Sequence, residues 1–188
     1  MKDRLRQTLQ LTNPWWTDPT PPRGWIGRSL MTTLRPMAQG QLVIAIRGMR
    51  RVGKTTLLRQ LAYDLIAARR VAARDVLFID FESPAIATLP ANHETLELLF
   101  TQWVETQAPG PRPLVILDEI QNIDGWARWV REAQETGRAA IIVTGSSSRL
   151  LDDEMATVLT GRVLQLALRP LLFEEFLALA SAARGEVI

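Results

Sequence analysis

Short apolar runs alternate along the chain with stretches in which apolar residues recur every three or four positions. The runs are rich in Val, Ile and Leu, and they lie at residues 41–47, 76–81, 114–118, 139–144 and 163–168. Continuous runs of this length are typical of strands that are covered on both faces of a parallel sheet. The pattern therefore predicts five parallel strands.

The stretches between the runs have the spacing of amphipathic helices. Apolar stripes follow the first four runs, at residues 57–66, 96–103, 126–133 and 150–159. Asn92 is placed to cap the second of these helices, and Trp126 and Trp129 belong to the stripe of the third. Repeated alternation of strand and helix predicts an α/β fold, a doubly wound five-stranded parallel sheet with helices on both faces.

The first 40 residues have a different pattern, and we predict that residues 1–40 form an N-terminal arm ahead of a single core domain at residues 41–188. Residues 1–12 are expected to form a short helix, whose apolar side carries Leu5, Leu9 and Leu11. The prolines at residues 14–22 exclude a regular helix in the next segment.

Composition narrows the chemistry that the chain can perform. Its 188 residues, 47% of them apolar, suffice for one core. The absence of Cys excludes disulfides, zinc–thiolate sites and thiol nucleophiles, and a single histidine, His93, argues against a catalytic triad. With 22 Lys and Arg against 20 Asp and Glu, the net charge of +2 does not support nucleic-acid binding. Without a membrane-spanning or signal-like segment, we expect a cytoplasmic protein.

The strongest motif follows the first run, where residues 48–55 (GMRRVGKT) match the Walker A pattern G-x-x-x-x-G-K-[ST]. Such a loop turns backbone N–H groups inward onto phosphate groups, and the start of the next helix adds its positive dipole end. Lys54 is expected to contact phosphate oxygens and Thr55 to contact Mg²⁺. Arg50 and Arg51 either steer the phosphates or remain solvated. The predicted nucleotide contacts are Gly48, Met49, Arg50, Arg51, Val52, Gly53, Lys54, Thr55 and Thr56.

The third run ends in two acids, Asp118 and Glu119, at the strand end where ligands bind in open parallel sheets. We predict that Asp118 holds Mg²⁺ together with Thr55 and that Glu119 is the general base for an attacking water. Asp80 and Glu82 form a rival pair, ranked second because their strand is expected nearer the sheet edge. The fourth strand is expected to lie between the first and the third.

Two further residues are candidates for catalysis. Ser146 follows the fourth strand and is predicted to hydrogen-bond the attacking water or the γ-phosphate; the alternative is a helix cap, for which Ser147 is also suited. Arg162 precedes the fifth strand, where it can act as an arginine finger on a neighbouring subunit. The alternative for Arg162 is to neutralise a helix end.

These motifs together resemble the AAA-type P-loop ATPases of bacteria and archaea. The resemblance covers most of the chain and rests on residues 48–56 (GMRRVGKTT), 117–121 (LDEIQ), 144–151 (TGSSSRLL), 161–162 (GR) and 169–177 (RPLLFEEFL), preceded by NPWW at 13–16. It implies a P-loop NTPase core of the AAA type.

Proteins of this kind usually continue into a helical and nuclease-like C-terminal region, whereas this chain ends at Ile188. We therefore expect the helical lid over the adenine to be missing or vestigial. In similar ATPases the segment before the first strand passes near the base, so Trp15 and Trp16 could stack on adenine. We favour the alternative that they anchor the arm to the core.

The resulting expectation is Mg²⁺-dependent binding and hydrolysis of ATP, coupled to a conformational switch or an oligomer. The alternative is a truncated module that binds ATP or ADP with little or no turnover. A small-molecule kinase ranks last, because residues 120–160 lack an arginine-rich lid. The expected cofactors are ATP and Mg²⁺, and the expected partners are further copies of the chain or a protein that supplies the C-terminal functions.

Overall fold

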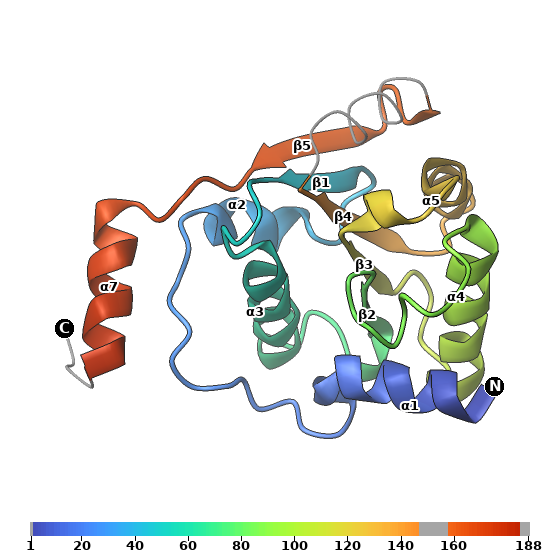
Figure 1. Ribbon diagram of the computed structural model, residues 1–188, viewed down its shortest axis with the longest axis horizontal. Helices are drawn as coiled ribbons and strands as arrows, with labels where there is room; N and C mark the ends of the chain where they lie inside the picture. The colour runs from blue at the N-terminus through green and yellow to red at the C-terminus, as the bar shows by residue number, and fades with distance from the viewer. Residues whose placement is uncertain (1, 147–157, 185–188) are drawn as a thin grey trace.

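Five parallel strands form the sheet of the computed structural model, which describes residues 2–146 and 158–184 (Figure 1). The strands are β1 (Val43–Arg47), β2 (Val76–Asp80), β3 (Leu114–Asp118), β4 (Ala140–Gly145) and β5 (Val163–Ala167). Their order across the sheet is β2-β3-β4-β1-β5. The parallel α/β fold is confirmed, as are the position of β4 between β1 and β3 and the position of β2 at an edge.

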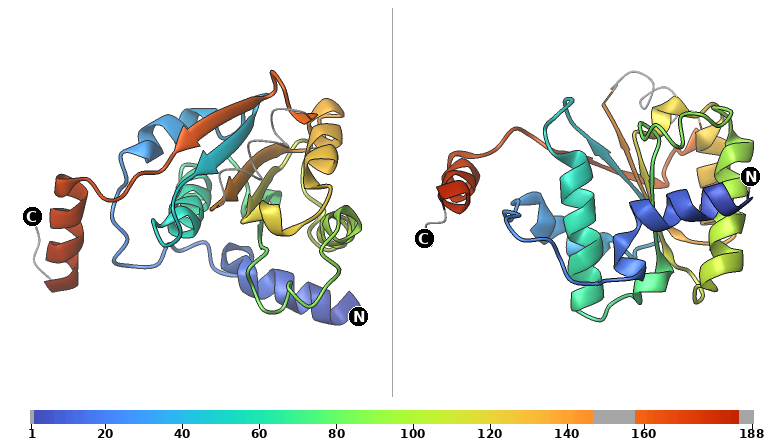
Figure 2. Two further views of the ribbon diagram at one scale, coloured as in Figure 1. Left: turned by 45° about the horizontal axis from the view of Figure 1, so that its top comes forward. Right: turned by 60° about the horizontal axis from the view of Figure 1, so that its bottom comes forward.

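Helices cover both faces of this sheet. The described helices are α1 (Lys2–Thr12), α2 (Leu30–Met37), α3 (Lys54–Ala67), α4 (His93–Gln107), α5 (Trp126–Glu135) and α7 (Phe173–Arg184), the last of which stands apart from the sheet. Short 3-10 turns are η1 (Pro14–Trp16), η2 (Ala73–Asp75) and η3 (Ile120–Asn122). The Asn92 side chain caps α4 by accepting a hydrogen bond from the Thr95 amide, as predicted. Figure 2 shows α3 and α4 on opposite sides of the sheet.

The core consists of two apolar clusters, one on each face. Because successive side chains of a strand point to opposite faces, Leu77 and Ile79 of β2 join the cluster beneath α1, α4 and α5. Val76 and Phe78 join the other cluster, beneath α2 and α3. This two-sided burial explains why the central strands read as continuous apolar runs.

The segment after α1 covers the edge of β2 that no other described strand pairs with. The buried Asn13 side chain accepts a hydrogen bond from the Phe78 amide at 2.6 Å and donates one to the Phe78 carbonyl at 3.0 Å, in the manner of a neighbouring strand. The indole N–H groups of Trp15 and Trp16 both donate to the Val76 carbonyl, at 3.2 and 2.9 Å. The predicted role of the two tryptophans as anchors of the arm is confirmed.

Three local expectations differ from the structure. Helix α2 was not expected, because it is short and contains Pro36, although its Met31 and Leu34 are buried. Leu11 was expected on the apolar side of α1, but its side chain is 75% exposed. β5 was expected to be covered on both faces, but it is half-exposed because it is an edge strand beside β1.

The helix expected at residues 150–159 lies largely outside the described residues, as does Ser147. Helix α7 begins beyond β5, after an extended segment, and stands apart from the sheet (Figures 1 and 2). Several of its apolar side chains are exposed, among them Phe173 at 74% and Phe176 at 54%.

No helix in the described part of the chain combines the length and the apolar character that a bilayer-spanning segment needs.

Candidate functional site

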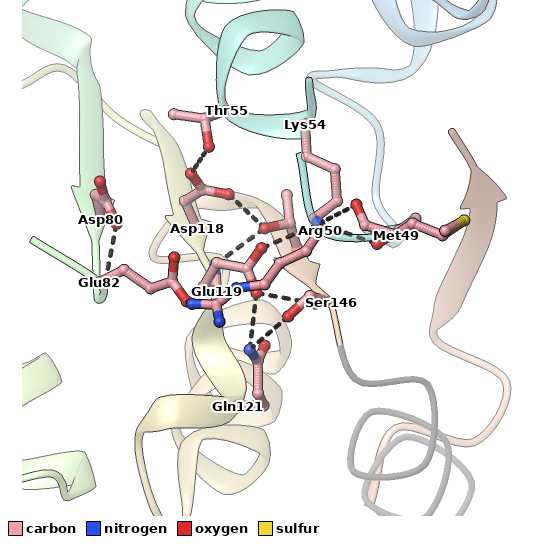
Figure 3. Close-up of polar contacts among 12 residues, drawn as sticks. Met49, Arg50, Lys54, Thr55, Asp80, Glu82, Asp118, Glu119, Gln121 and Ser146 are labelled. Carbon is pink, nitrogen blue, oxygen red and sulfur yellow. Dashed lines mark hydrogen bonds and ion pairs between the residues drawn. The ribbon is translucent and has the colours of Figure 1, made fainter. Parts of the chain in front are cut away.

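Polar side chains from four strand ends meet at one edge of the sheet (Figure 3). The loop 48–53 follows β1, Asp118 ends β3 and is followed by Glu119, Ser146 follows β4, and Asp80 ends β2. The register pairs Leu117 of β3 with Val143 of β4 and Asp80 of β2 with Asp118. Because all strands are parallel, their carboxyl ends fall on the same edge, where open α/β sheets bind ligands.

The conformation of the loop 48–53 depends on its two glycines. A Cβ on Gly48 would lie 2.6 Å from the Leu168 carbonyl oxygen, so no side chain fits there. Gly53 has a φ of 97°, in the left-handed region that favours glycine. It is the N-cap residue of α3, and because it has no side chain, it makes no capping hydrogen bond to the first N–H groups of the helix. The first N–H groups of α3 are therefore placed to bind an anion at the mouth of the loop.

Lys54 is the first residue of α3 and lies beneath this loop. Its side chain is buried, and the ammonium group donates hydrogen bonds to the carbonyls of Gly48 at 3.0 Å and Met49 at 3.2 Å. The same group forms a 3.0 Å ion pair with Glu119. The structure thus brings the predicted phosphate-binding lysine and the predicted general base into direct contact.

The remaining loop residues lie along the rim. Met49 is 70% exposed, and the Val52 amide donates to the Met49 carbonyl at 3.3 Å. Arg51 is exposed and has a φ of 64°. Thr56, which follows Thr55 in the first turn of α3, is exposed.

Asp118 is surrounded by hydroxyl groups and other carboxylates. The Thr55 hydroxyl donates to one carboxylate oxygen at 2.6 Å, and the Thr144 hydroxyl donates to the other. Burial raises the pKa of Asp118 above its ordinary value, and the nearby Asp80 and Glu119 add to the rise, whereas the two hydroxyl hydrogen bonds oppose it. The site therefore holds a carboxylate whose negative charge is poorly compensated.

We expect the substitution Asp118→Asn to increase the free energy of unfolding, by an amount that is larger at pH 8 than at pH 4. A raised folded-state pKa means that the folded protein binds the proton more tightly than the unfolded chain does. The charge costs no stability below the unfolded-state value near 3.8, and the cost develops as the pH rises through the folded-state pKa. Urea unfolding from pH 4 to pH 8 measures this difference.

The matched control is Asp124→Asn, because Asp124 is exposed and its removal should leave the unfolding free energy within about 0.5 kcal/mol of the parent. A lower stability of Asp118→Asn than of the parent protein at pH 8 would show that the hydrogen bonds from Thr55 and Thr144 outweigh the burial of the charge.

Glu119 is held by several donors at once. One carboxylate oxygen accepts from the Ser146 amide at 2.9 Å and from the Gln121 side chain at 2.7 Å, and the other faces Lys54. Burial acts to raise the pKa of Glu119, but the hydrogen bonds from Gln121, Lys54 and Ser146 outweigh it and lower the pKa below its ordinary value. Glu119 is therefore ionised at neutral pH, as a proton acceptor must be.

Two residues of this network were not among the predicted site residues. Thr144 is fully buried, and besides contacting Asp118 its hydroxyl accepts a hydrogen bond from the Glu119 amide at 2.9 Å. Gln121 donates to Glu119 and, at 3.4 Å, to the Ser146 hydroxyl. Ser146 thus contributes its backbone N–H to Glu119, and its hydroxyl lies beside Gln121.

The rival acids lie at the margin of the same site. Asp80 accepts a hydrogen bond from the Glu82 amide at 2.9 Å, and Glu82 forms an ion pair with Arg50 at the protein surface. Arg50 is thus paired with an acid rather than being simply solvated. Asp80 acts on the site through its charge beside Asp118.

Two cavities meet at the loop 48–53. The first, of about 650 Å³, is lined by charged and hydroxyl side chains that include Lys54, Thr55 and Glu119. The second, of about 450 Å³, is largely apolar, with Trp25, Ile26 and Leu179 in its wall. Both cavities also contact Arg50, Arg51, Gly53 and Thr56. A ligand with an apolar planar part and an anionic part can occupy both.

The residues around Asp118 suit a hard cation such as Mg²⁺. Among the described residues, no group of three or more His, Cys, Asp and Glu side chains is arranged to hold a metal ion. Mg²⁺ does not require such a group, because it keeps several waters and takes one or two protein oxygens. The Thr55 hydroxyl and the Asp118 carboxylate, 2.6 Å apart, offer those oxygens, and a cation would offset the repulsion between Asp118 and its acidic neighbours.

Arg162 directly precedes β5 and therefore lies at the amino-terminal end of the strands, opposite the site. Its carbonyl accepts from the Val43 amide at the start of β1, and its side chain forms a 3.0 Å ion pair with Glu135 at the end of α5. The length of β5, about 13 Å at roughly 3.3 Å per residue, separates it from the loop 48–53. Arg162 therefore does not reach the site of its own chain, and its action on a neighbouring subunit stays a prediction.

Comparison with known proteins assigns this arrangement to a family. A family model described as "AAA domain" matches residues 40–177. An uncharacterized protein of Haemophilus influenzae is 32% identical over 134 residues, which make up 70% of this chain and 32% of that protein. An uncharacterized protein of Methanocaldococcus jannaschii is 37% identical over 132 residues, 70% of this chain and 27% of that protein. The matched region thus covers less than a third of either relative.

Proposed function

The chain belongs to the AAA domain family, and from that premise we propose that it binds ATP together with Mg²⁺ and hydrolyses the ATP. The observation that carries the proposal is the contact of Lys54 with Glu119 at the mouth of a glycine-shaped loop, beside the Thr55–Asp118 pair. Lys54, Thr55 and Glu119 line one cavity, and Asp118 contacts Thr55. This arrangement supports the proposed roles of Lys54 in binding phosphate, of Glu119 in accepting a proton, and of Thr55 and Asp118 in holding a metal ion.

In the proposed binding mode the two cavities divide the nucleotide between them. The triphosphate occupies the charged cavity, where Lys54 and the first amides of α3 bind its oxygens. The adenine occupies the apolar cavity beside Trp25 and Ile26. Trp15 and Trp16 do not take part, because they are bound to the edge of β2.

In the proposed reaction, Glu119 accepts a proton from a water molecule. The water oxygen bonds to the γ-phosphorus as the bond to the β-γ bridging oxygen breaks, and ADP leaves. Gln121 and the Ser146 amide hold the Glu119 carboxylate in position. Lys54 leaves its ion pair with Glu119 to contact the phosphates, so the carboxylate is freed to take the proton. Thr55 and Asp118 would hold Mg²⁺, which would supply positive charge to offset that of the phosphates.

The matched region covers 32% and 27% of the two relatives. What the chain acts on and which partners it has are therefore proposed from its own residues alone. We propose assembly into a homo-oligomer in which Arg162, whose side chain pairs with Glu135 at the end of α5, acts on the site of a neighbouring copy.

The unmodified protein tests the proposal. We expect saturable binding of ATP in calorimetry, at micromolar to millimolar concentrations, about the usual range of enzyme KM values, and release of phosphate that stops when EDTA removes Mg²⁺. Binding without any phosphate release would favour the alternative, a module that only reports nucleotide occupancy. The absence of ATP binding would overturn the proposal.

A further inference from the structure

Arg28 joins three segments that are far apart in the sequence. Its guanidinium donates to the Val52 carbonyl in the loop 48–53 at 3.1 Å and to the Arg169 carbonyl, after β5, at 2.7 Å. Its Nε donates to Glu175 of α7 at 3.0 Å, and both side chains of this ion pair are less than 10% exposed (9% and 8%). Three acceptors in three directions match the fixed fork of a guanidinium and not the single nitrogen of lysine.

The contact with Val52 determines how the phosphate-binding loop presents its next amide. The carbonyl of Val52 and the N–H of Gly53 belong to one peptide unit, and the described part of the chain contains no cis peptide bond. In a trans peptide the two groups point in opposite directions. By holding the Val52 carbonyl, Arg28 therefore fixes the direction of the Gly53 N–H, one of the amides proposed to bind phosphate.

Glu175 in turn holds Arg28 and the start of α7. It is buried, unlike the exposed Phe173 and Phe176 of the same helix. One carboxylate oxygen accepts from the Ser29 amide at 2.8 Å, and the other accepts from the Leu172 amide at 2.9 Å and from Arg28. The chain from Arg28 to Ser29 is thereby clamped between the loop 48–53 and α7.

We propose that Arg28 is a positioning residue through which α7 and the loop 48–53 stabilise each other, so that the Glu175 contact raises the affinity for the phosphate part of the nucleotide. The inference rests on the proposed function, because it concerns the ligand of the same loop. Glu175 lines neither of the two cavities, whereas Arg28 lines the apolar one, so the effect of Glu175 on binding is indirect.

The coupling is reciprocal, as linkage requires. A ligand that binds best when the Gly53 N–H is correctly directed also favours the state in which Arg28 contacts Val52 and Glu175. The adenine cavity adds to this effect, because Leu171 and Leu179 from the α7 side share its wall with Trp25. Nucleotide binding therefore strengthens the docking of α7.

The test compares the affinities of variants for ATP and for adenosine, each measured by competition with a fluorescent ATP analogue. Glu175→Gln keeps the shape of the side chain and an acceptor oxygen but loses the charge that faces Arg28. We expect it to weaken ATP binding about tenfold, a typical coupling, and to weaken adenosine binding by a smaller factor, because adenosine lacks the phosphates that contact the loop 48–53. The matched control is Glu174→Gln, an exposed neighbour on the same helix, which should bind both ligands as the parent does.

Arg28→Ala and Arg28→Lys provide independent variants. Each should weaken ATP binding at least as much as Glu175→Gln, and the double variant Arg28→Ala/Glu175→Gln should bind no more weakly than Arg28→Ala alone. Thermal unfolding of each variant shows that the compared proteins are folded. Unchanged ATP affinity in Glu175→Gln, or an equal loss for adenosine, would overturn the inference alone. No ATP binding by the unmodified protein would overturn the proposed function and the inference together.

Discussion

Glu119→Gln is expected to lower the rate of ATP hydrolysis by about 10²–10⁴-fold, the usual contribution of a general base. The amide has nearly the shape of the carboxylate but cannot accept a proton from water at neutral pH. ATP binding should persist or become tighter, because Lys54 loses the carboxylate with which it pairs at 3.0 Å and remains available to the phosphates. Phosphate release in single-turnover experiments and calorimetric binding of ATP measure the two effects separately.

Two further variants are needed to interpret the hydrolysis rate of Glu119→Gln. Glu132→Gln changes an exposed acid on α5 and should hydrolyse ATP at the parent rate. Glu82→Gln tests the rival acid, which is paired with Arg50 at the margin of the cavity. Hydrolysis that survives Glu119→Gln but is lost in Glu82→Gln would transfer the role of base to the pair formed by Asp80 and Glu82.

The sheet and the main site residues were predictable because their signals are local and their meeting follows from topology. The apolar runs identified the five strands, and parallel strands place their carboxyl ends on one edge. The loop 48–53 after β1 and the acids after β3 therefore had to lie near each other once β4 was placed between them. The contact between Lys54 and Glu119 agrees with that expectation.

Thr144 and Gln121 were missed for a different reason, because their roles depend on register and on a local turn. Several hydroxyl residues follow one another at the end of β4, and only the pairing of Leu117 with Val143 brings Thr144 level with Asp118. Glu119 has a φ of 54°, which is uncommon for a residue with a side chain. This turn brings the Gln121 side chain back onto Glu119. The sequence pattern does not indicate that Glu119 adopts this backbone conformation.

Arg28 and Glu175 were hidden by distance along the chain, since 147 positions separate them. Neither stands in a motif that identifies a partner, and Arg28 lies in a segment rich in proline and glycine. Glu175 belongs to the stretch 169–177 that carried part of the family resemblance, but the resemblance did not indicate what it contacts. A pair of this kind emerges only when the folded chain brings the arm, the loop and α7 together.

Lys54→Ala is expected to weaken ATP binding by roughly 30-fold to 4,000-fold, since removing one member of a buried, hydrogen-bonded charge pair costs about 2–5 kcal/mol and each 1.4 kcal/mol is tenfold. The lysines of the chain are Lys2 and Lys54, which permits a direct assignment. An acyl-phosphate derivative of ATP transfers its acyl group to a lysine amine beside the phosphates and releases ATP. Peptide mapping should find the acyl group on Lys54, and Lys2→Ala should bind ATP as the parent does.

The loss in Lys54→Ala has two sources that a double variant separates. The substitution removes a cation from the phosphates, and it also leaves the buried Glu119 without its ion pair, so that its charge repels them. Lys54→Ala/Glu119→Gln removes the repulsion while the cation stays absent, and it should therefore recover part of the affinity but not all of it. Full recovery would mean that Lys54 serves only to neutralise Glu119. Unchanged ATP binding in Lys54→Ala, or equal labelling of Lys2 and Lys54, would contradict the assignment of the loop 48–53 to phosphate.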